Sequence, residues 1–419
     1  MTKTLTEVQL NTLLESMRLI NSTLDLDELL TIIMKEITEN LNAERSTLYI
    51  VDHSKNEIWS KIAQGEKKLV IRQAIGKGIS GYVAKTGRIL NIRDAYTDPR
   101  FNPAFDKKSG FQTRSVLCVP VFNKDKHIIA ILQILNKRNG YFSGKDQLFS
   151  SVFADYISLA IQNAQLYQEA LERKRLEDEI AVAGEIQKML LPSHLPQLND
   201  YEIFTFHEAS RYIGGDYYDF FPDTEKLLFI LADVAGKGTP AALLMANLQA
   251  TVHNLVGKCQ NNQELVAMIN NHLCSVTPLD KYATLVWGDL DLNTHEFKYI
   301  IAGHPPPLLL KQNNPSTDVK ELLVRSIPVG MIPHVDYQQG SITIAPGELL
   351  IVYSDGITEA QNKRNQMFDE TRLITIVKRH INQKLDEMGD RIIERVKEFT
   401  RGGIYEDDIT LLMIRRKPV

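Results

Sequence analysis

The chain has 419 residues, which is too long for one ordinary hydrophobic core, and its hydrophobic fraction of 43% and charged fraction of 24% are those of a folded globular protein. It carries 48 Lys and Arg against 52 Asp and Glu, so its net charge of -4 provides no overall basic field to attract nucleic acid or anionic lipid. These values predict two domains and exclude a general nucleic-acid or membrane-surface binder.

The N-terminal residues lack the apolar core of a signal peptide, and no apolar run approaches the roughly 18–20 residues of a membrane span. We therefore expect a cytoplasmic protein. The three cysteines, Cys118, Cys259 and Cys274, are scattered and share no CxxC spacing. We expect neither a disulfide framework nor a zinc site, and we interpret all three as small core residues.

The first part of the chain combines helical and strand patterns. A first helix is indicated by apolar residues at Leu13, Leu14, Met17 and Ile20, and a second run follows Asp25 at Leu29, Ile32, Ile33 and Ile37. Runs rich in β-branched and apolar residues then cover 46–51, 115–121 and 128–135. These patterns predict helices packed on a mainly antiparallel sheet.

A heptad pattern follows, with apolar residues alternately four and three positions apart at Phe153, Ile157, Ala160, Ala164, Tyr167 and Leu171. This spacing is typical of a coiled coil and predicts a homodimer. The rule would continue at Lys174 and Asp178, but the apolar residues reappear at Leu176, Ile180 and Ala183. Such a slip disturbs supercoiling. Either the helix merely bends at Lys174–Arg175, or the slip lets the helix transmit a signal between domains.

A second domain is predicted after Pro192 and Pro196, because proline ends the preceding helix. Beyond them, strand patterns cover 227–231, 284–290, 297–301, 349–353 and 410–414. Helical patterns cover 240–256, 263–276, 370–379 and 388–399. This alternation predicts a layered α/β sandwich.

Four acidic motifs lie at predicted strand ends or tight turns, namely GGDYYD (214–219), ADVAGKG (232–238), SDG (354–356) and DDIT (407–410). Glycine beside a carboxylate allows the backbone to approach a ligand closely. Oxygen ligands without His or Cys favour a hard cation, Mg2+ or Mn2+. One Asp-Gly pair alone usually marks only a turn, so the inference depends on the whole set.

The ordered motifs GGDYYD, ADVAGKG, AGHPPP, YSDGITE and DDIT, preceded by EIQKMLLP, resemble the SpoIIE/RsbU branch of the PPM (type 2C) serine/threonine phosphatases. The resemblance extends over about Glu185 to Arg416. It implies a PPM-type α/β/β/α sandwich with two bound Mn2+ or Mg2+ ions. It also implies a phosphoserine or phosphothreonine substrate on a STAS-domain anti-anti-sigma protein.

The same resemblance implies that the metal ions and the catalysis depend on four aspartates, with the Val234 carbonyl completing one metal site: Asp216, Asp233, Asp355 and Asp407. Asp408 is adjacent, and either it or Asp407 is the direct ligand; we favour Asp407. Two ions about 3.5–4 Å apart would activate a bridging water for attack on phosphorus.

Three further residues near these motifs have both functional and structural interpretations. His304, in AGHPPP, could protonate the leaving group or could be a turn residue, and Arg211 could contact phosphate or simply lie on the surface. Asp219 could support a metal ligand from behind, or could be a hydrogen-bond acceptor at a strand end.

The segment GKGISGYVAKTGRILNIRDAYTDPRFNP (76–103), followed by SVLCVPV, resembles GAF domains over about residues 25–165. Asn136, Lys137, Phe142 and Asp146 resemble the NKxnFxxxDE signature of cyclic-nucleotide-binding GAF domains, but Gln147 replaces the final Glu. The resemblance implies a site for cAMP or cGMP, contacted by residues 89–105. A structural Lys137–Asp146 ion pair would explain the same residues without a ligand, and we prefer it.

The expected fold is therefore α+β, with a GAF domain and N-terminal helix at 1–165, a coiled-coil linker helix at 166–192 and a phosphatase domain at 193–419. The expected function is a metal-dependent protein serine/threonine phosphatase regulated by the GAF domain. One alternative is a catalytically silent sensor and scaffold. Another is a cyclase, because GGDYYD is similar to GGDEF, but the Glu-Phe ending is absent.

Overall fold

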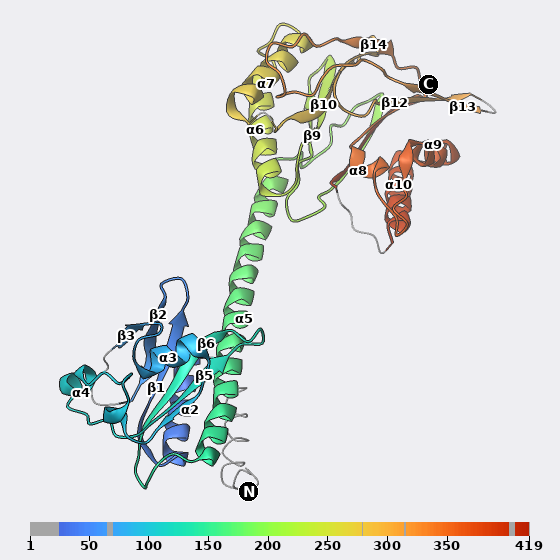
Figure 1. Cartoon of the computed structure of the whole chain (residues 1–419). Helices are drawn as coiled ribbons and strands as arrows, with labels where there is room; N and C mark the ends of the chain where they lie inside the picture. Colours follow the sequence, from blue (N-terminus) through green and yellow to red (C-terminus); the bar gives the residue numbers. More distant parts are fainter. Residues whose placement is uncertain (1–24, 65–69, 279, 314–315, 402–406, 419) are drawn as a thin grey trace. The chain divides into compact units, whose positions relative to one another are not determined.

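The computed structural model describes residues 25–64, 70–278, 280–313, 316–401 and 407–418, and the chain forms two compact units that divide after Lys174 (Figure 1). The helix expected around Leu13–Ile20 lies outside the described residues. Within those described residues, every helix is either too short or too polar to cross a lipid bilayer.

The first unit is an antiparallel sheet of six strands in the order β3-β2-β1-β6-β5-β4, with helices on it. This confirms the predicted antiparallel sheet. Its elements in chain order are α2 (Leu26–Asn40), β1 (Ala43–Asp52), β2 (Glu57–Ala63), β3 (Arg72–Ala74), α3 (Gly78–Thr86), β4 (Leu90–Ile92), the 3-10 helix η1 (Ala95–Thr97), α4 (Ala104–Ser109), β5 (Val116–Phe122), β6 (Ile128–Lys137) and the first part of α5 (Gly144–Lys188).

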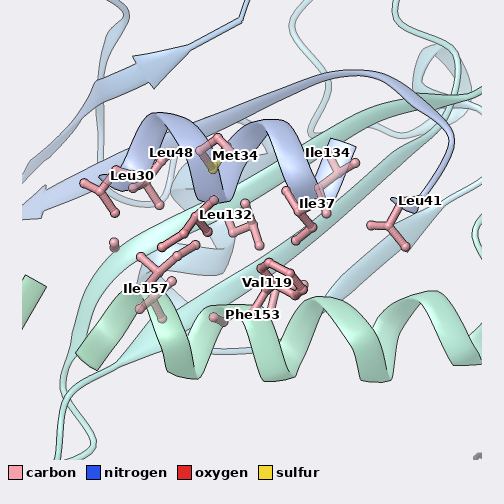
Figure 2. Packing of buried hydrophobic residues seen from close by; sticks show 14 of the residues in the cluster. Leu30, Met34, Ile37, Leu41, Leu48, Val119, Leu132, Ile134, Phe153 and Ile157 are labelled. Carbon is pink, nitrogen blue, oxygen red and sulfur yellow. The ribbon is translucent and has the colours of Figure 1, made fainter. Parts of the chain in front are cut away.

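Helix α2 begins where the sequence predicts, because the Asp25 carboxylate accepts hydrogen bonds from the backbone N–H groups of Asp27 and Glu28. Its apolar side packs with the sheet and with α5 around Met34 and Ile37 (Figure 2). Burying such aliphatic side chains contributes about 1.5–3 kcal/mol each relative to exposure. This core therefore holds α2 and α5 to the sheet.

The first half of the expected coiled-coil seam lies in this same core. Phe153, Ile157 and Ala160 have exposed fractions of 0%, 0% and 2%, and they pack within their own unit. The prediction that these three residues meet a second chain is wrong, because heptad spacing identifies an apolar helix face but not the surface that covers it. Further along α5, Tyr167 and Leu171 are each 44% exposed.

The phase slip at Lys174–Arg175 does not interrupt the helix, since α5 continues without a break to Lys188. Pro192 follows its end, as predicted.

The cysteines match the prediction only in part: all three are free, but Cys118 alone is fully buried, whereas Cys259 and Cys274 are half-buried.

The second unit contains two five-stranded sheets, ordered β14-β11-β10-β9-β8 and β13-β12-β15-β16-β7. The strands and helices expected from the sequence are all present, with bounds shifted by a few residues. In chain order the elements are β7 (Tyr201–Glu208), β8 (Tyr217–Pro222), β9 (Lys226–Val234), α6 (Thr239–Leu255), α7 (Asn262–Val276), β10 (Ala283–Asp291), β11 (Glu296–Ala302), β12 (Leu308–Asn313), β13 (Ser316–Glu321), β14 (Gly340–Thr343), β15 (Leu349–Tyr353), α8 (Asp355–Thr358), α9 (Asp369–His380), α10 (Leu385–Phe399) and β16 (Ile409–Arg416).

Three cores order these elements into layers. Side chains such as Phe229 of β9 and Leu412 of β16 form one core shared by the two sheets. Helices α6 and α7 cover the other face of the first sheet, in a core that includes Trp287. Helices α9 and α10 cover the other face of the second sheet. The two sheets therefore lie face to face, and the ends of their strands can contribute to one site.

Candidate active site

The predicted aspartates come from the ends of four strands, two in each sheet. Asp216 immediately precedes β8, and Asp233 lies next to the last residue of β9. These strands pair antiparallel, with Tyr217 opposite Ala232. Asp355 follows β15 as the first residue of α8, and Asp407 and Asp408 precede β16. The start of one strand thus lies beside the end of its neighbour in both sheets.

Asp408 joins the two sheets through backbone hydrogen bonds. Its Oδ1 accepts from the N–H of Ser210 at 2.8 Å, and its Oδ2 accepts from the N–H of Gly215 at 2.6 Å. A Cβ on Gly214 would lie only 2.4 Å from the same Oδ2, so glycine is required there. Asp408 therefore holds the loop that leads to Asp216.

Asp216 is 2% exposed and accepts a hydrogen bond from the Thr410 hydroxyl. Its pKa is raised well above the usual range by burial and by the charges of Asp233 and Asp408, while hydrogen bonds from Thr410 and Ser354 lower it. The tertiary structure thus brings buried carboxylates from both sheets close enough to repel one another.

Asp233 and Asp355 belong to the same electrostatic cluster. Burial, followed by the charges of Asp355, Asp407 and Asp408, raises the pKa of Asp233 to about 8. Burial, followed by the charges of Asp407 and Glu359, raises the pKa of Asp355 to about 6. A bound cation would favour the ionised form of each carboxylate and relieve this repulsion.

Lys237 supplies a positive charge to this cluster, and the sequence interpretation did not select it. Its Nζ lies 3.2 Å from Oδ2 of Asp407, whose side chain is 34% exposed. Lys237 follows Gly236, which has a φ of +108° that favours glycine. The sequence signal was its place inside ADVAGKG, in the turn that follows β9 and its Asp233.

Among the described residues, no three His, Cys, Asp or Glu side chains are arranged so that they could hold a metal ion. Two of the carboxylates bind donors of the protein itself: Lys237 pairs with Asp407, and backbone N–H groups bind Asp408. The available ligands are nevertheless all oxygens, and a Cβ on Gly215 would lie 2.9 Å from the Val234 carbonyl oxygen. This chemistry fits Mg2+ or Mn2+.

His304 is buried and both of its ring nitrogens are engaged, so the structure does not support its role as a proton donor. Nδ1 lies 2.7 Å from the Thr284 hydroxyl, and Nε2 lies 3.1 Å from the Tyr353 carbonyl oxygen. Burial lowers its pKa to about 3. The neutral imidazole instead connects β10 to β15, and thereby the strand beside Asp233 to the strand before Asp355.

The other two residues with open interpretations lie outside the carboxylate cluster. Arg211 is exposed on the loop before Gly214. Asp219 is a hydrogen-bond acceptor, as expected, but its partners are the Tyr217 hydroxyl at 2.9 Å and Nε2 of His253 at 2.6 Å.

In the first unit, the cyclic-nucleotide signature residues bind other protein groups. Nζ of Lys137 lies 2.7 Å from Oδ1 of Asp146, which is the ion pair preferred from the sequence. The Asn136 amide group donates to Glu44 and to the Gln112 carbonyl oxygen. These contacts connect β6 with neighbouring segments and explain the residues structurally.

Comparison with protein families gives one match in each unit. Residues 25–161 match the model of the GAF domain. Residues 223–417 match the model described as stage II sporulation protein E (SpoIIE). Together these two ranges cover most of both units.

Individual proteins give consistent similarities. The chain is 25% identical over 245 residues to phosphoserine phosphatase RsbU of Bacillus subtilis, covering 58% of this chain and 72% of that protein. It is 28% identical over 282 residues to protein IcfG of Synechocystis, covering 60% of this chain but only 43% of that protein. The solved SiaA-PP2C domain of Pseudomonas aeruginosa has a TM-score of 0.52 at 20% identity, covering 59% of this chain and 99% of that domain.

Proposed function

The chain is a protein serine/threonine phosphatase that combines a GAF domain with a SpoIIE-family domain, and we propose that it is a two-metal enzyme controlled by its GAF domain. The proposed GAF domain is residues 1–165, the linker helix is 166–192, and the PPM-type α/β/β/α sandwich is 193–419. The single observation that carries this proposal is the group of mutually repelling, largely buried carboxylates at the strand ends of both sheets.

The proposed ligands of two Mn2+ or Mg2+ ions are the Val234 carbonyl oxygen and the carboxylates of Asp216, Asp233, Asp355 and Asp407. Asp407 is favoured over Asp408 because the Asp408 oxygens accept from the N–H groups of Ser210 and Gly215 and so hold the loop before Asp216. The Asp407 oxygens instead meet the N–H of the adjacent Asp408 and the partly exposed Lys237. When bound, the two ions would supply an activated water and neutralise charge on the phosphoryl group.

The chain's own residues prepare this chemistry by fixing the ligands. Thr410 donates to Asp216, while the Ser354 hydroxyl accepts from the N–H of Thr410 at 2.9 Å. Asp408 holds the loop before Asp216, and His304 connects β10, which pairs with the strand of Asp233, to β15, which ends just before Asp355. Such preorganisation matters because a displacement of about 1 Å can reduce a reaction rate roughly 100-fold.

The proposed substrate is a phosphoserine or phosphothreonine of a STAS-domain regulatory protein in a partner-switching pathway. The similarity to a phosphoserine phosphatase supports the phosphoserine. The catalytically silent scaffold is less well supported, because every proposed carboxylate ligand is present and the charges of Asp355, Asp407 and Asp408 raise the pKa of Asp233 although Lys237 lies beside Asp407.

We further propose that two copies pair through exposed apolar residues of α5, confined to the part after Ala160. Tyr167 and Leu171 of the predicted seam are each 44% exposed, and Leu176, where the apolar residues resume after the slip, is 54% exposed. Pairing would remove such side chains from water, which stabilises association in rough proportion to the apolar area buried. A coiled-coil dimer would also allow the state of the GAF domain to reach the phosphatase domain.

The test is phosphate release from phosphorylated STAS-domain proteins by the full chain, with Mn2+ or Mg2+. The variant Asp355→Asn should lose activity while retaining the fold. Asp390 is an exposed carboxylate on α10, so the control variant Asp390→Asn should retain both activity and fold. Unchanged phosphate release by Asp355→Asn would contradict the two-metal mechanism. Adding cAMP or cGMP tests the nucleotide ligand, although the Lys137–Asp146 pair already accounts for the signature residues.

A further inference from the structure

The last turns of α5 contact the loop that leads to Asp216. The Gln187 side chain makes two hydrogen bonds to one residue of that loop: its Nε2 donates to the Gly214 carbonyl oxygen at 2.7 Å, and its Oε1 accepts from the Gly214 N–H at 3.0 Å. A carboxamide with a donor and an acceptor on the same backbone residue fixes both the position and the orientation of that residue.

Gly184 brings the helix and the loop close together, one turn before Gln187. It is buried, whereas Glu185 and Ile186 beside it are exposed. A Cβ on Gly184 would lie 2.2 Å from the Tyr212 carbonyl oxygen, a separation that real Cβ atoms do not show. Leu191, one further turn along, packs against the apolar cores of the same unit. One side of the helix end therefore lies directly on the loop.

The hydrogen bonds from Gln187 to Gly214 also restrict the position of Asp216, which lies two residues further along the loop. Gly214, which Gln187 holds, is followed by Gly215, whose N–H donates to Asp408 Oδ2 at 2.6 Å. The next residue is Asp216, whose N–H also faces Asp408 Oδ2, at 3.4 Å. The segment is thus held by α5 on one side and by the start of β16 on the other, and both contacts lie within two residues of the carboxylate.

We propose that Gln187 is a positioning residue that sets the Asp216 carboxylate for metal binding, so that a movement of the end of α5 changes the affinity for metal. This inference rests on the proposed function and assigns a specific contact to its regulation. One residue of helix rotation turns a side chain by about 100° and shifts it by about 1.5 Å. Because hydrogen bonds require about 2.7–3.2 Å, such a movement breaks both bonds to Gly214.

The test is calorimetric titration of the full chain with Mn2+. Gln187→Met keeps the length of the side chain but removes both strong hydrogen bonds, and we expect the Mn2+ Kd to rise about tenfold. Gln187→Glu keeps an acceptor for the Gly214 N–H and loses the donor. Its Mn2+ Kd should therefore lie between that of the wild type and that of Gln187→Met. At saturating Mn2+, kcat should remain within about twofold of the wild-type value, because the ions then hold Asp216 themselves.

Two further variants complete the design. Gly184→Ala should weaken Mn2+ binding in the same direction, because the added methyl group forces α5 away from Tyr212. Glu185→Gln lies on the same turn but is exposed and pairs only locally with Lys188, so it should bind Mn2+ as the wild type does. Far-ultraviolet circular dichroism and thermal melting would verify that each variant is folded.

An unchanged Mn2+ Kd in folded Gln187→Met would overturn the proposal. So would a variant whose stability or kcat falls while its Mn2+ Kd stays the same, since that pattern indicates a merely structural contact. If Gln187→Met does not fold, Gln187→Glu decides in the same way. A wild-type chain that binds Mn2+ but releases no phosphate would contradict the proposed activity alone, whereas one that binds no Mn2+ would overturn both.

Discussion

Buried charges are compensated in the first unit but only partly compensated in the second. In the first unit, Lys137 and Asp146 neutralise each other at 2.7 Å, and the N–H of Ser143 also donates to Asp146. In the second unit, Asp216, Asp233 and Asp355 lie near one another with only partial compensation, and their pKa values rise. A satisfied pair stabilises a fold, while clustered like charges cost stability and persist where a function needs them. The comparison distinguishes a structural ion pair from a candidate catalytic centre.

The largest expected effect comes from Asp233→Asn. We expect phosphatase activity to fall at least about 100-fold, because a proposed metal ligand loses its charge. The same variant should raise the stability of the metal-free protein by about 1 kcal/mol or more, because it removes a buried carboxylate that its neighbours repel. Urea unfolding without metal measures this, and a loss of stability would contradict the contrast between the units.

Asp146→Asn should have the opposite effect on stability. Removing the charge leaves the largely buried ammonium of Lys137 without its partner, and the first unit should lose about 2 kcal/mol. Denaturant unfolding would measure the change, with exposed Asp125→Asn as the control. A neutral result would mean that the pair contributes little to stability and would reopen a ligand-binding role for these residues.

His304 provides a pH test of the connection between the strands. Its folded-state pKa of about 3 lies below the ordinary value of 6.5, so the unfolded chain binds a proton that the native protein excludes. The stability contributed by neutral His304 is therefore present above pH 6.5 and lost as the pH falls towards 3, at up to about 1.4 kcal/mol per pH unit.

The buried aspartates oppose this trend, because their raised pKa values favour the folded state at lower pH. The informative measurement is therefore the difference in unfolding free energy between the wild type and His304→Gln across pH 4–7. This difference should shrink as the pH falls, since the variant has no imidazole to protonate. A difference that does not depend on pH would show that burial does not keep His304 neutral.

The smallest expected effect concerns Lys237. Because Lys237 and Asp407 are partly exposed, their pair contributes less than about 1 kcal/mol. In Lys237→Met the ammonium no longer competes with a metal ion for Asp407, so Mn2+ should bind up to about fivefold more tightly in a calorimetric titration. Lys237→Arg should bind as the wild type does. Weaker binding in Lys237→Met would indicate that Lys237 supports the metal site.

Local patterns in the sequence determined a large part of this protein. The acceptor at Asp25 predicted the start of α2, and runs of β-branched and other apolar residues predicted strands such as β5 and β16, because these signals depend on neighbouring residues. The placement of the acidic motifs at strand ends was also predictable, since Asp and Gly interrupt the apolar runs. The order of these motifs predicted the phosphatase domain, and the separate segment 76–103 predicted the GAF domain.

Only the tertiary structure decided which surfaces and donors these residues meet. Heptad spacing could not show that Phe153 packs in the core of its own unit, because an apolar face looks the same whatever covers it. Nor could the sequence show that Asp408 binds backbone N–H groups, that His304 connects two strands, or that Gln187 holds Gly214. Each of these contacts joins residues at least 20 positions apart, and such pairing depends on how the sheets and helices pack.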